Sequence, residues 1–149
     1  MGFLRIRATV DERPGRLASL AAALQSLVSA EAVMELAATY GFTGENATEC
    51  VAAAVEAGDR GEPLLDEIAG RLALGVASVC VVLDPGLVVL AGEISQAGGA
   101  VLTSRIEEAV ARICPVRPQV VPSQVAGNPV LRGAVLAALD QAREEIFAS

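Results

Sequence analysis

The run from Leu83 to Ser95 constrains the fold of this chain more than any other segment. It reads Leu-Asp-Pro-Gly-Leu-Val-Val-Leu-Ala-Gly-Glu-Ile-Ser. Pro85 stops the helix before it, because its ring removes a hydrogen-bond donor and clashes with the preceding turn. The apolar run Leu87–Ala91 is typical of a strand covered on both faces, and Gly92 then turns the chain into another helix. The segment therefore predicts a helix, a buried strand and a second helix in direct succession.

Helical spacing of apolar residues dominates the chain before this run. Three helices with polar starts are expected: 30–40 after Ser29, 47–57 after Asn46, and one reaching residue 83 that Asp59 caps. Gly41 and Gly58 are expected to end the first two. Residues 76–83, at the end of the third helix, are apolar on nearly every side, so we expect them to lie centrally buried.

Strands are few and are spread along the chain. A period-two pattern lies near its start, where apolar Leu4, Ile6, Ala8 and Val10 alternate with Arg5, Arg7 and Thr9. This pattern predicts an edge strand with one wet face. Further strands are expected at 87–91 and at 116–121, the latter weakened by Pro118, with helices at 16–28, at 98–113, and from a cap at Asn128 to about Phe147.

The alternation of strand and helix in the second half predicts an α/β fold with a short parallel or mixed sheet and a predominance of helices. A sheet this short leaves an edge or a helical face that another lobe or a second copy would cover. At 149 residues with 53% apolar residues, the chain is long enough for one domain with a real core and too short for two ordinary ones.

Charge and apolar content exclude two classes of partner. Eleven basic residues against 18 acidic ones give a formal net charge of -7, and the basic residues are scattered, so nucleic acid binding by this segment is not expected. A membrane-spanning helix would need a run of about 18 apolar residues, and no such run occurs. Charged residues near the start, where an export signal would be apolar, lead us to expect a cytoplasmic protein.

The residue types that most often carry chemistry are sparse. The chain has no histidine, the commonest acid/base at neutral pH and the commonest nitrogen ligand for metals. Cys50, Cys80 and Cys114 are odd in number and widely spaced, so we expect reduced and mostly buried thiols.

Several motifs in the second half resemble a known family. They are Leu83-Asp84-Pro85, Val88-Val89-Leu90, Ala91-Gly92-Glu93 with Ser95, and Gly127-Asn128-Pro129 followed by Leu131-Arg132-Gly133-Ala134. Together they resemble the C-terminal part of the ROK family (repressors, open reading frames and kinases). The resemblance implies one domain over residues 1–149 that forms the C-terminal lobe of an actin-like ATPase, or ribonuclease H-like, fold. The N-terminal lobe and any DNA-binding domain would then be absent from this chain.

The glycine-rich turn after the strand departs from the family pattern. In the family's kinases this turn is normally Gly-Gly-Gly, which lets the backbone come close to the nucleotide; here Ala91 adds a side chain and Glu93 adds a carboxylate. The resemblance makes Gly92, Glu93 and Ser95 the candidate residues of a vestigial nucleotide turn. A carboxylate facing phosphates is repulsive. The alternative is that Glu93 merely starts a helix, where it meets the positive end of the helix dipole.

The first part of the chain departs from the family pattern as well. Relatives usually carry a Gly-His pair, a cysteine-rich zinc loop and a glutamate that touches the sugar. Here Gly2-Phe3 stands where Gly-His would be, residues 13–23 contain no cysteine, and Gln25 stands where that glutamate is expected. We therefore expect no metal, and Gln25 is the candidate for sugar contact, with a merely solvated side chain as the alternative. Arg132 could face the same region or be solvated.

No catalytic residue is expected in this chain. The kinase reaction needs an Asp-x-Gly-x-Thr phosphate loop and an aspartate base, and neither occurs here. The resemblance therefore favours the effector-binding and dimerisation lobe of a sugar-responsive ROK-type transcriptional regulator, without a cofactor and as a homodimer. The alternatives are the same lobe of a divergent sugar kinase acting on glucose or an amino sugar, and a self-assembly module without a ligand.

Overall fold

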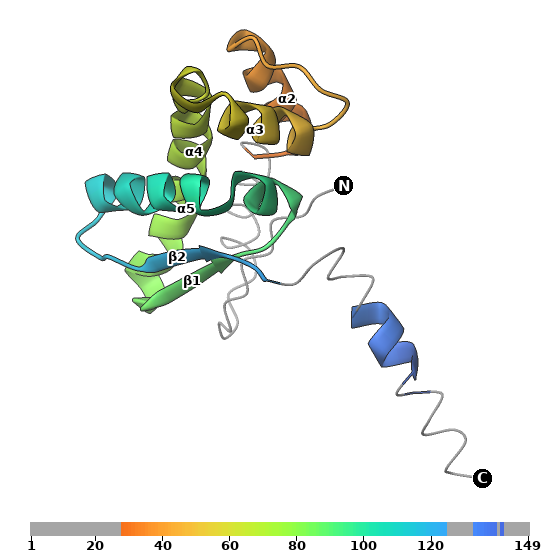
Figure 1. Ribbon diagram of the computed structural model, residues 1–149. Coiled ribbons are helices and arrows are strands. Elements are labelled where there is room, and N and C mark those ends of the chain that lie inside the picture. The colour runs from red at the N-terminus through yellow and green to blue at the C-terminus, as the bar shows by residue number, and fades with distance from the viewer. Residues whose placement is uncertain (1–27, 125–132, 140, 142–149) are drawn as a thin grey trace.

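A computed structural model of the chain describes residues 28–124, 133–139 and 141. Its elements are α2 (Ala30–Thr39), α3 (Ala47–Glu56), the 3-10 helix η1 (Gly58–Arg60), α4 (Glu62–Leu83), β1 (Leu87–Leu90), α5 (Glu93–Ile113) and β2 (Gln119–Pro122). Figure 1 shows α2, α3 and the start of α4 on one side of α5 and the two strands on the other. The expected class, an α/β fold that is mostly helical, is confirmed for this part of the chain.

The starts of α2 and α3 follow the expected capping. The Ser29 side chain accepts a hydrogen bond from the Ala32 N–H at 3.2 Å, and Asn46 accepts one from the Glu49 N–H at 2.9 Å. Each satisfies an N–H that has no partner within its helix. Gly41, with φ 78°, follows α2 in the left-handed conformation that favours glycine.

The expectation that Asp59 caps α4 is wrong. Asp59 lies within η1, and α4 begins after Gly61, which has no side chain to act as a cap. Gly61 packs directly on α3, where a Cβ would overlap the carbonyl oxygen of Ala54. The close approach of the two backbones therefore selects glycine at this helix start in place of a capping side chain.

The core lies between α3, α4 and α5. Its largest fully buried side chains are Leu64, Leu65, Ile68 and Val76 of α4, Val51 of α3, and Leu102, Ile106 and Val110 of α5, joined by Val33 and Leu90. The three cysteines are free and buried, as expected. At the surface, Arg105 of α5 contacts Glu62 at 2.8 Å and Asp66 at 2.5 Å, which links α5 to the first turns of α4.

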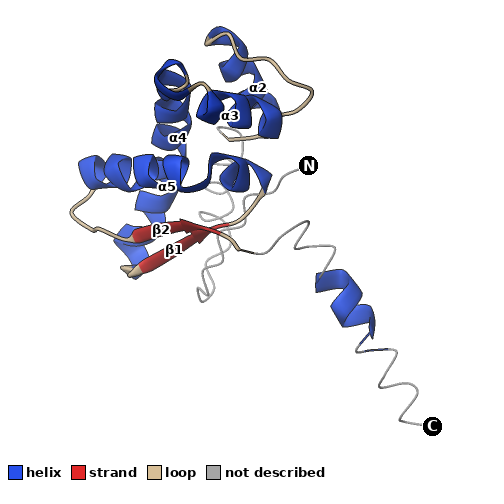
Figure 2. Ribbon diagram, viewed as in Figure 1, coloured by secondary structure: helices blue, strands red, loops and turns tan. Residues whose placement is uncertain are grey.

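The end of α4 and strand β1 are less covered than expected. Val81 and Val82 are each 70% exposed, which contradicts the prediction that 76–83 is centrally buried. Leu87 and Val89 are 52% and 51% exposed, so β1 is not covered on both faces. The described sheet has only two strands, and β2 is the strand nearer α5 (Figure 2). Leu90 is buried whereas Leu87 and Val89, on the other face of β1, are about half exposed, so only one face of β1 is covered.

The two strands are parallel, in agreement with the expected sheet type. Leu87 pairs with Gln119 and Leu90 pairs with Pro122. The second strand starts three residues later than expected because Pro118 cannot donate to a ladder. The helix before it starts at Glu93 instead of residue 98, with a break at Gly99, whose φ is 51°.

Some expected elements lie outside the described residues. They are the strand at 4–10, the helix up to residue 27 and the capped start of the last helix at Asn128, although residues 133–139 of that last helix are described and helical. Among the described residues, none of the helices combines the length and the apolar content that crossing a bilayer requires.

Candidate functional site

Three helix starts and the end of β1 surround one pocket of about 130 Å³. The first residue of α2, Ala30, lines it beside Asn46–Thr48 at the start of α3 and Glu93–Ser95 at the start of α5. Leu90–Gly92 closes the side at the carboxyl end of β1. The remaining wall is apolar and comes from Val28, Val33, Ile68 and Leu72.

The turn between β1 and α5 is held in place by its own hydrogen bonds. Gly92 has φ 116° and ψ 161°, a backbone conformation that side-chain-bearing residues rarely adopt. The Ser95 hydroxyl, in a side chain that is only 5% exposed, donates to the Leu90 carbonyl at 3.0 Å. The Ser123 N–H donates to the same carbonyl at 2.7 Å. Ser95 therefore positions the turn, since its proton is committed to the backbone.

The electrostatics of the pocket combine two opposing contributions. The first N–H groups of a helix carry partial positive charge, and α5 begins at Gly92 without a side-chain cap. Glu93, the first residue of α5, is exposed and also lines the pocket. Its negative charge offsets part of the positive field of the helix start.

The start of α3 supplies the other polar part of the wall. Glu49 is already engaged there, because it accepts from the Glu45 N–H at 2.9 Å and from the Asn46 side-chain amide at 3.3 Å. Thr48 lines the pocket as a partly buried residue. Thr48 therefore places a hydroxyl group beside the apolar wall of the pocket, while the Asn46 side chain is engaged with Glu49.

The structure brings together the three residues proposed from the turn. Gly92, Glu93 and Ser95 all line the pocket. Gln25 and Arg132 lie outside the described residues. Sequence reasoning missed the contributions of Asn46 and Thr48. Asn46 carried a signal as a helix start, but nothing in the sequence indicates that the start of α3 faces the start of α5.

The buried thiols are not set up as nucleophiles. Burial raises the pKa of Cys50, with the neighbouring Glu49 carboxylate adding to the effect. Burial also raises the pKa of Cys80, with smaller contributions from Cys114 and Asp84. Both thiols therefore stay protonated at neutral pH. Within 28–124, 133–139 and 141, no three cysteine, aspartate or glutamate side chains gather in a way that could hold a metal ion.

Comparison with known proteins gives one match. A family model described as "ROK family" matches residues 20–141, which is most of the chain. No curated protein and no solved structure matches the chain. The matched range includes every residue that lines the pocket.

Proposed function

Since the chain belongs to the ROK family, we propose that it is the effector-binding and dimerisation lobe of a sugar-responsive ROK-type transcriptional regulator. It has no turnover by itself, because the kinase phosphate loop and the aspartate base do not occur in its sequence. A sugar effector would bind the whole regulator, with this lobe forming one wall of the cleft. Two copies would associate through this lobe.

The observation that supports a regulator over a kinase is the position of Glu93. Glu93 lines the pocket at the start of α5 and brings one negative charge next to the turn where the family's kinases normally have three glycines. Ala91 lines the same pocket and adds a methyl group where those kinases leave space. Both changes disfavour the close approach of a nucleotide, one by charge and one by volume.

One observation favours the alternative, a lobe of a divergent sugar kinase. Gly92 keeps the glycine conformation of the turn, and the start of α5 has no side-chain cap, so its N–H groups remain available to an acceptor. Helix starts of this kind bind phosphate groups. A kinase would require that the positive field of the helix start dominates at the pocket. A regulator would require that the negative charge of Glu93 dominates there.

Titration calorimetry of the chain with ATP separates these functions. We expect no binding of ATP up to about 1 mM, which corresponds to a binding free energy weaker than about -4 kcal/mol. The double variant Ala91→Gly with Glu93→Gly restores the glycine turn, and we expect it to bind ATP at least about tenfold more tightly, a gain of about 1.4 kcal/mol. Binding of ATP to the unchanged chain with micromolar affinity would refute the proposal.

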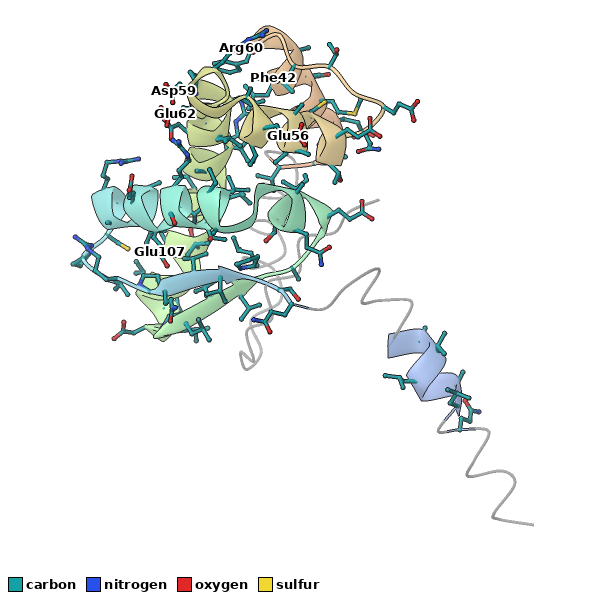
Figure 3. The ribbon with its side chains drawn as sticks, in the orientation of Figure 1. Phe42, Glu56, Asp59, Arg60, Glu62 and Glu107 are labelled. Atoms are coloured by element: carbon teal, nitrogen blue, oxygen red, sulfur yellow. The ribbon has the colours of Figure 1, made fainter. Side chains whose placement is uncertain are left out.

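The matched control is Glu56→Gln. Glu56, labelled in Figure 3, is exposed and is the last residue of α3, whose first residues line the pocket. The substitution removes one unit of negative charge, as the loss of Glu93 does. We expect this variant to leave ATP binding unchanged. If it improves binding as much as the double variant does, net charge and not the turn decides the affinity.

A second measurement addresses the effector and the reaction. A protein that carries this lobe together with its N-terminal lobe is incubated with glucose or an amino sugar, with and without ATP. If the protein is a regulator, it should bind the sugar without forming a sugar phosphate. Formation of a sugar phosphate would establish the kinase. A flat sugar titration together with a dimer that persists on dilution would favour the self-assembly module.

A further inference from the structure

Two of the three cysteines lie at the ends of packed helices that lead into the sheet. Cys80 is in the last turn of α4, where its carbonyl accepts from the N–H of Asp84, the residue that ends this helix, at 2.9 Å. Cys114 is the residue that ends α5. The two helices lead into β1 and β2, which are parallel neighbours with Leu87 opposite Gln119. Both cysteines therefore lie near the amino ends of the same pair of strands.

The end of α5 is fixed against the sheet. The Glu107 carboxylate accepts a hydrogen bond from the Val120 N–H of β2 at 2.5 Å, and Glu107 lies between α5 and β2 in Figure 3. The Arg117 guanidinium donates to the Cys114 carbonyl at 2.8 Å, which holds the turn that follows the helix. Contacts on both sides of Cys114 along the chain therefore set its position.

The thiols of Cys80 and Cys114 share one buried cluster, in which the two residues are 0% and 8% exposed. Burial is the main cause of the raised pKa of Cys80, and the charge of a Cys114 thiolate is the next. A charge has such an effect only on a group that lies near it. The charge that acts on Cys50, in α3, belongs instead to the Glu49 carboxylate. Cys80 and Cys114 are therefore neighbouring thiols.

We propose that Cys80 and Cys114 form a redox-sensitive pair that a peroxide converts into a disulfide. Cys114 reacts first because it is the more exposed of the two, and its thiol donates to the Val116 carbonyl only over a long distance, 3.9 Å. Cys80 stays protonated at neutral pH and does not attack the peroxide itself. It is the second thiol, which reacts once Cys114 has been oxidised.

The oxidation takes place in two balanced steps. The deprotonated Cys114 sulfur attacks one oxygen of hydrogen peroxide: an S–O bond forms, the O–O bond breaks, and the departing hydroxide takes up the proton that the thiol had released. The Cys80 sulfur then attacks the sulfenic acid at Cys114. An S–S bond forms, the S–O bond breaks, and the departing hydroxide takes the Cys80 proton. The two thiols lose two electrons in all, and the peroxide is reduced to two water molecules.

The disulfide closes a loop that contains the turn of the candidate site. Residues 81–113 lie inside this loop, among them Gly92, Glu93 and Ser95. The pocket lies at the carboxyl end of β1 and the cysteine pair near its amino end, so the disulfide tethers α4 to α5 without entering the pocket. The pair does not depend on the proposed function.

Oxidation of the full chain by hydrogen peroxide, followed by intact mass and peptide mapping, tests the proposal. At about pH 8, where more thiol is deprotonated, we expect the folded chain to lose two hydrogen atoms and to yield a peptide that links Cys80 to Cys114. Cys50 stays a free thiol, and dithiothreitol restores the original mass. The same oxidation in urea should give all three pairings in comparable amounts, because the entropy of loop closure depends only weakly on loop length.

Two variants sharpen the test. Cys80→Ala leaves Cys114 without its partner, and we expect it to accumulate sulfenic acid at Cys114, which dimedone traps, without a disulfide inside the chain. Cys50→Ala removes a thiol that is equally buried and is the matched control, which keeps the linkage between Cys80 and Cys114.

The comparison of the folded chain with the chain in urea needs no substitution, so it decides the question even where a variant does not fold. A folded chain that stays fully reduced would overturn the proposal. The same conclusion would follow from a linkage to Cys50, from the mixture seen in urea, or from sulfinic acid at Cys114 in place of the disulfide.

Discussion

The two ends of α4 are similarly apolar in sequence and differ sharply in their surroundings. The first four turns carry Leu64, Leu65 and Ile68, each at most 1% exposed between α3 and α5. The last turn carries Val81 and Val82, each 70% exposed. Apolar composition predicts that a helix has something to pack against, whereas the neighbouring elements decide which of its turns do so. The end of α4 is therefore an apolar surface that the described residues leave largely uncovered.

The largest expected effect contrasts the two ends directly. Leu65→Ala leaves a cavity among α3, α4 and α5, and we expect it to lower the free energy of unfolding by about 2–5 kcal/mol. Val82→Ala removes methyl groups that are mostly in water, and its expected effect is within about 0.5 kcal/mol. Urea denaturation followed by circular dichroism measures both. A loss of several kcal/mol for Val82→Ala would mean that the last turn of α4 is already covered.

The next effect concerns how tightly α4 approaches its neighbours. Gly61→Ala would place a Cβ on the backbone of Ala54, and we expect a loss of about 1–3 kcal/mol from the displacement of α3. Gly70→Ala is the control, because a Cβ there has open space inside the same helix. We expect it to stabilise the chain by about 0.5–1 kcal/mol through helix propensity. Equal effects of the two variants would contradict the close packing at the start of α4.

The third effect is the pH dependence of the free energy of unfolding, which reports whether the thiols are buried. The pKa values of Cys50 and Cys80 are raised in the folded chain above the ordinary value of 9.0, chiefly by burial. The folded state therefore holds these protons more tightly than the unfolded state. Their contribution to stability is fully present below pH 9 and is lost as the pH rises above it, at no more than about 1.4 kcal/mol per pH unit for each thiol.

Denaturation midpoints between pH 7 and 10.5 test this dependence. Replacing both cysteines with alanine should flatten the decline above pH 9, after correction for the lower stability of the variant at pH 7. An unchanged alkaline slope would show that the two thiols are not buried as described.

The smallest effect comes from the exposed ion pairs at the start of α4. Arg105→Met removes contacts to Glu62 and Asp66, whose side chains are 52% and 62% exposed. Because solvent screens such pairs, we expect a loss of only about 0.2–1 kcal/mol. The difference between the variant and the unchanged chain should shrink in 1 M NaCl, and a difference that persists at high salt would mean that the packing of the Arg105 side chain matters more than its charge.

Local patterns in the sequence predicted much of this fold because they depend on neighbouring residues. The caps at Ser29 and Asn46, the end of α4 before Pro85 and the turn at Gly92 each follow from a few adjacent residues. The start of α4 was not predictable in this way. Gly61 is required there by the backbone of Ala54, which lies beside it only once α3 and α4 have packed.

The candidate site likewise contains residues that could be predicted from the sequence and residues that could not. Gly92, Glu93 and Ser95 could be predicted because they share one turn with a recognisable pattern. Asn46 and Thr48 could not, since they come from a helix start far away in sequence, and only the packing of α3 against α5 brings them to the pocket. The exposure of Val81 and Val82 was missed for a related reason, because a uniformly apolar helix end carries no information on which neighbours are present.

The proline and the carboxylate on the outer side of β2 also limit how this domain can polymerise. Fibrils of the cross-β type need every chain to offer two free sides, one to the molecule above and one to the molecule below. The Glu107 carboxylate accepts from the Val120 N–H and Pro122 has no N–H, so one edge of the described sheet is closed, and association of two molecules through β1 and β2 cannot propagate beyond a pair. The described sheet, which carries the exposed Val89, therefore offers cross-β stacking only one edge.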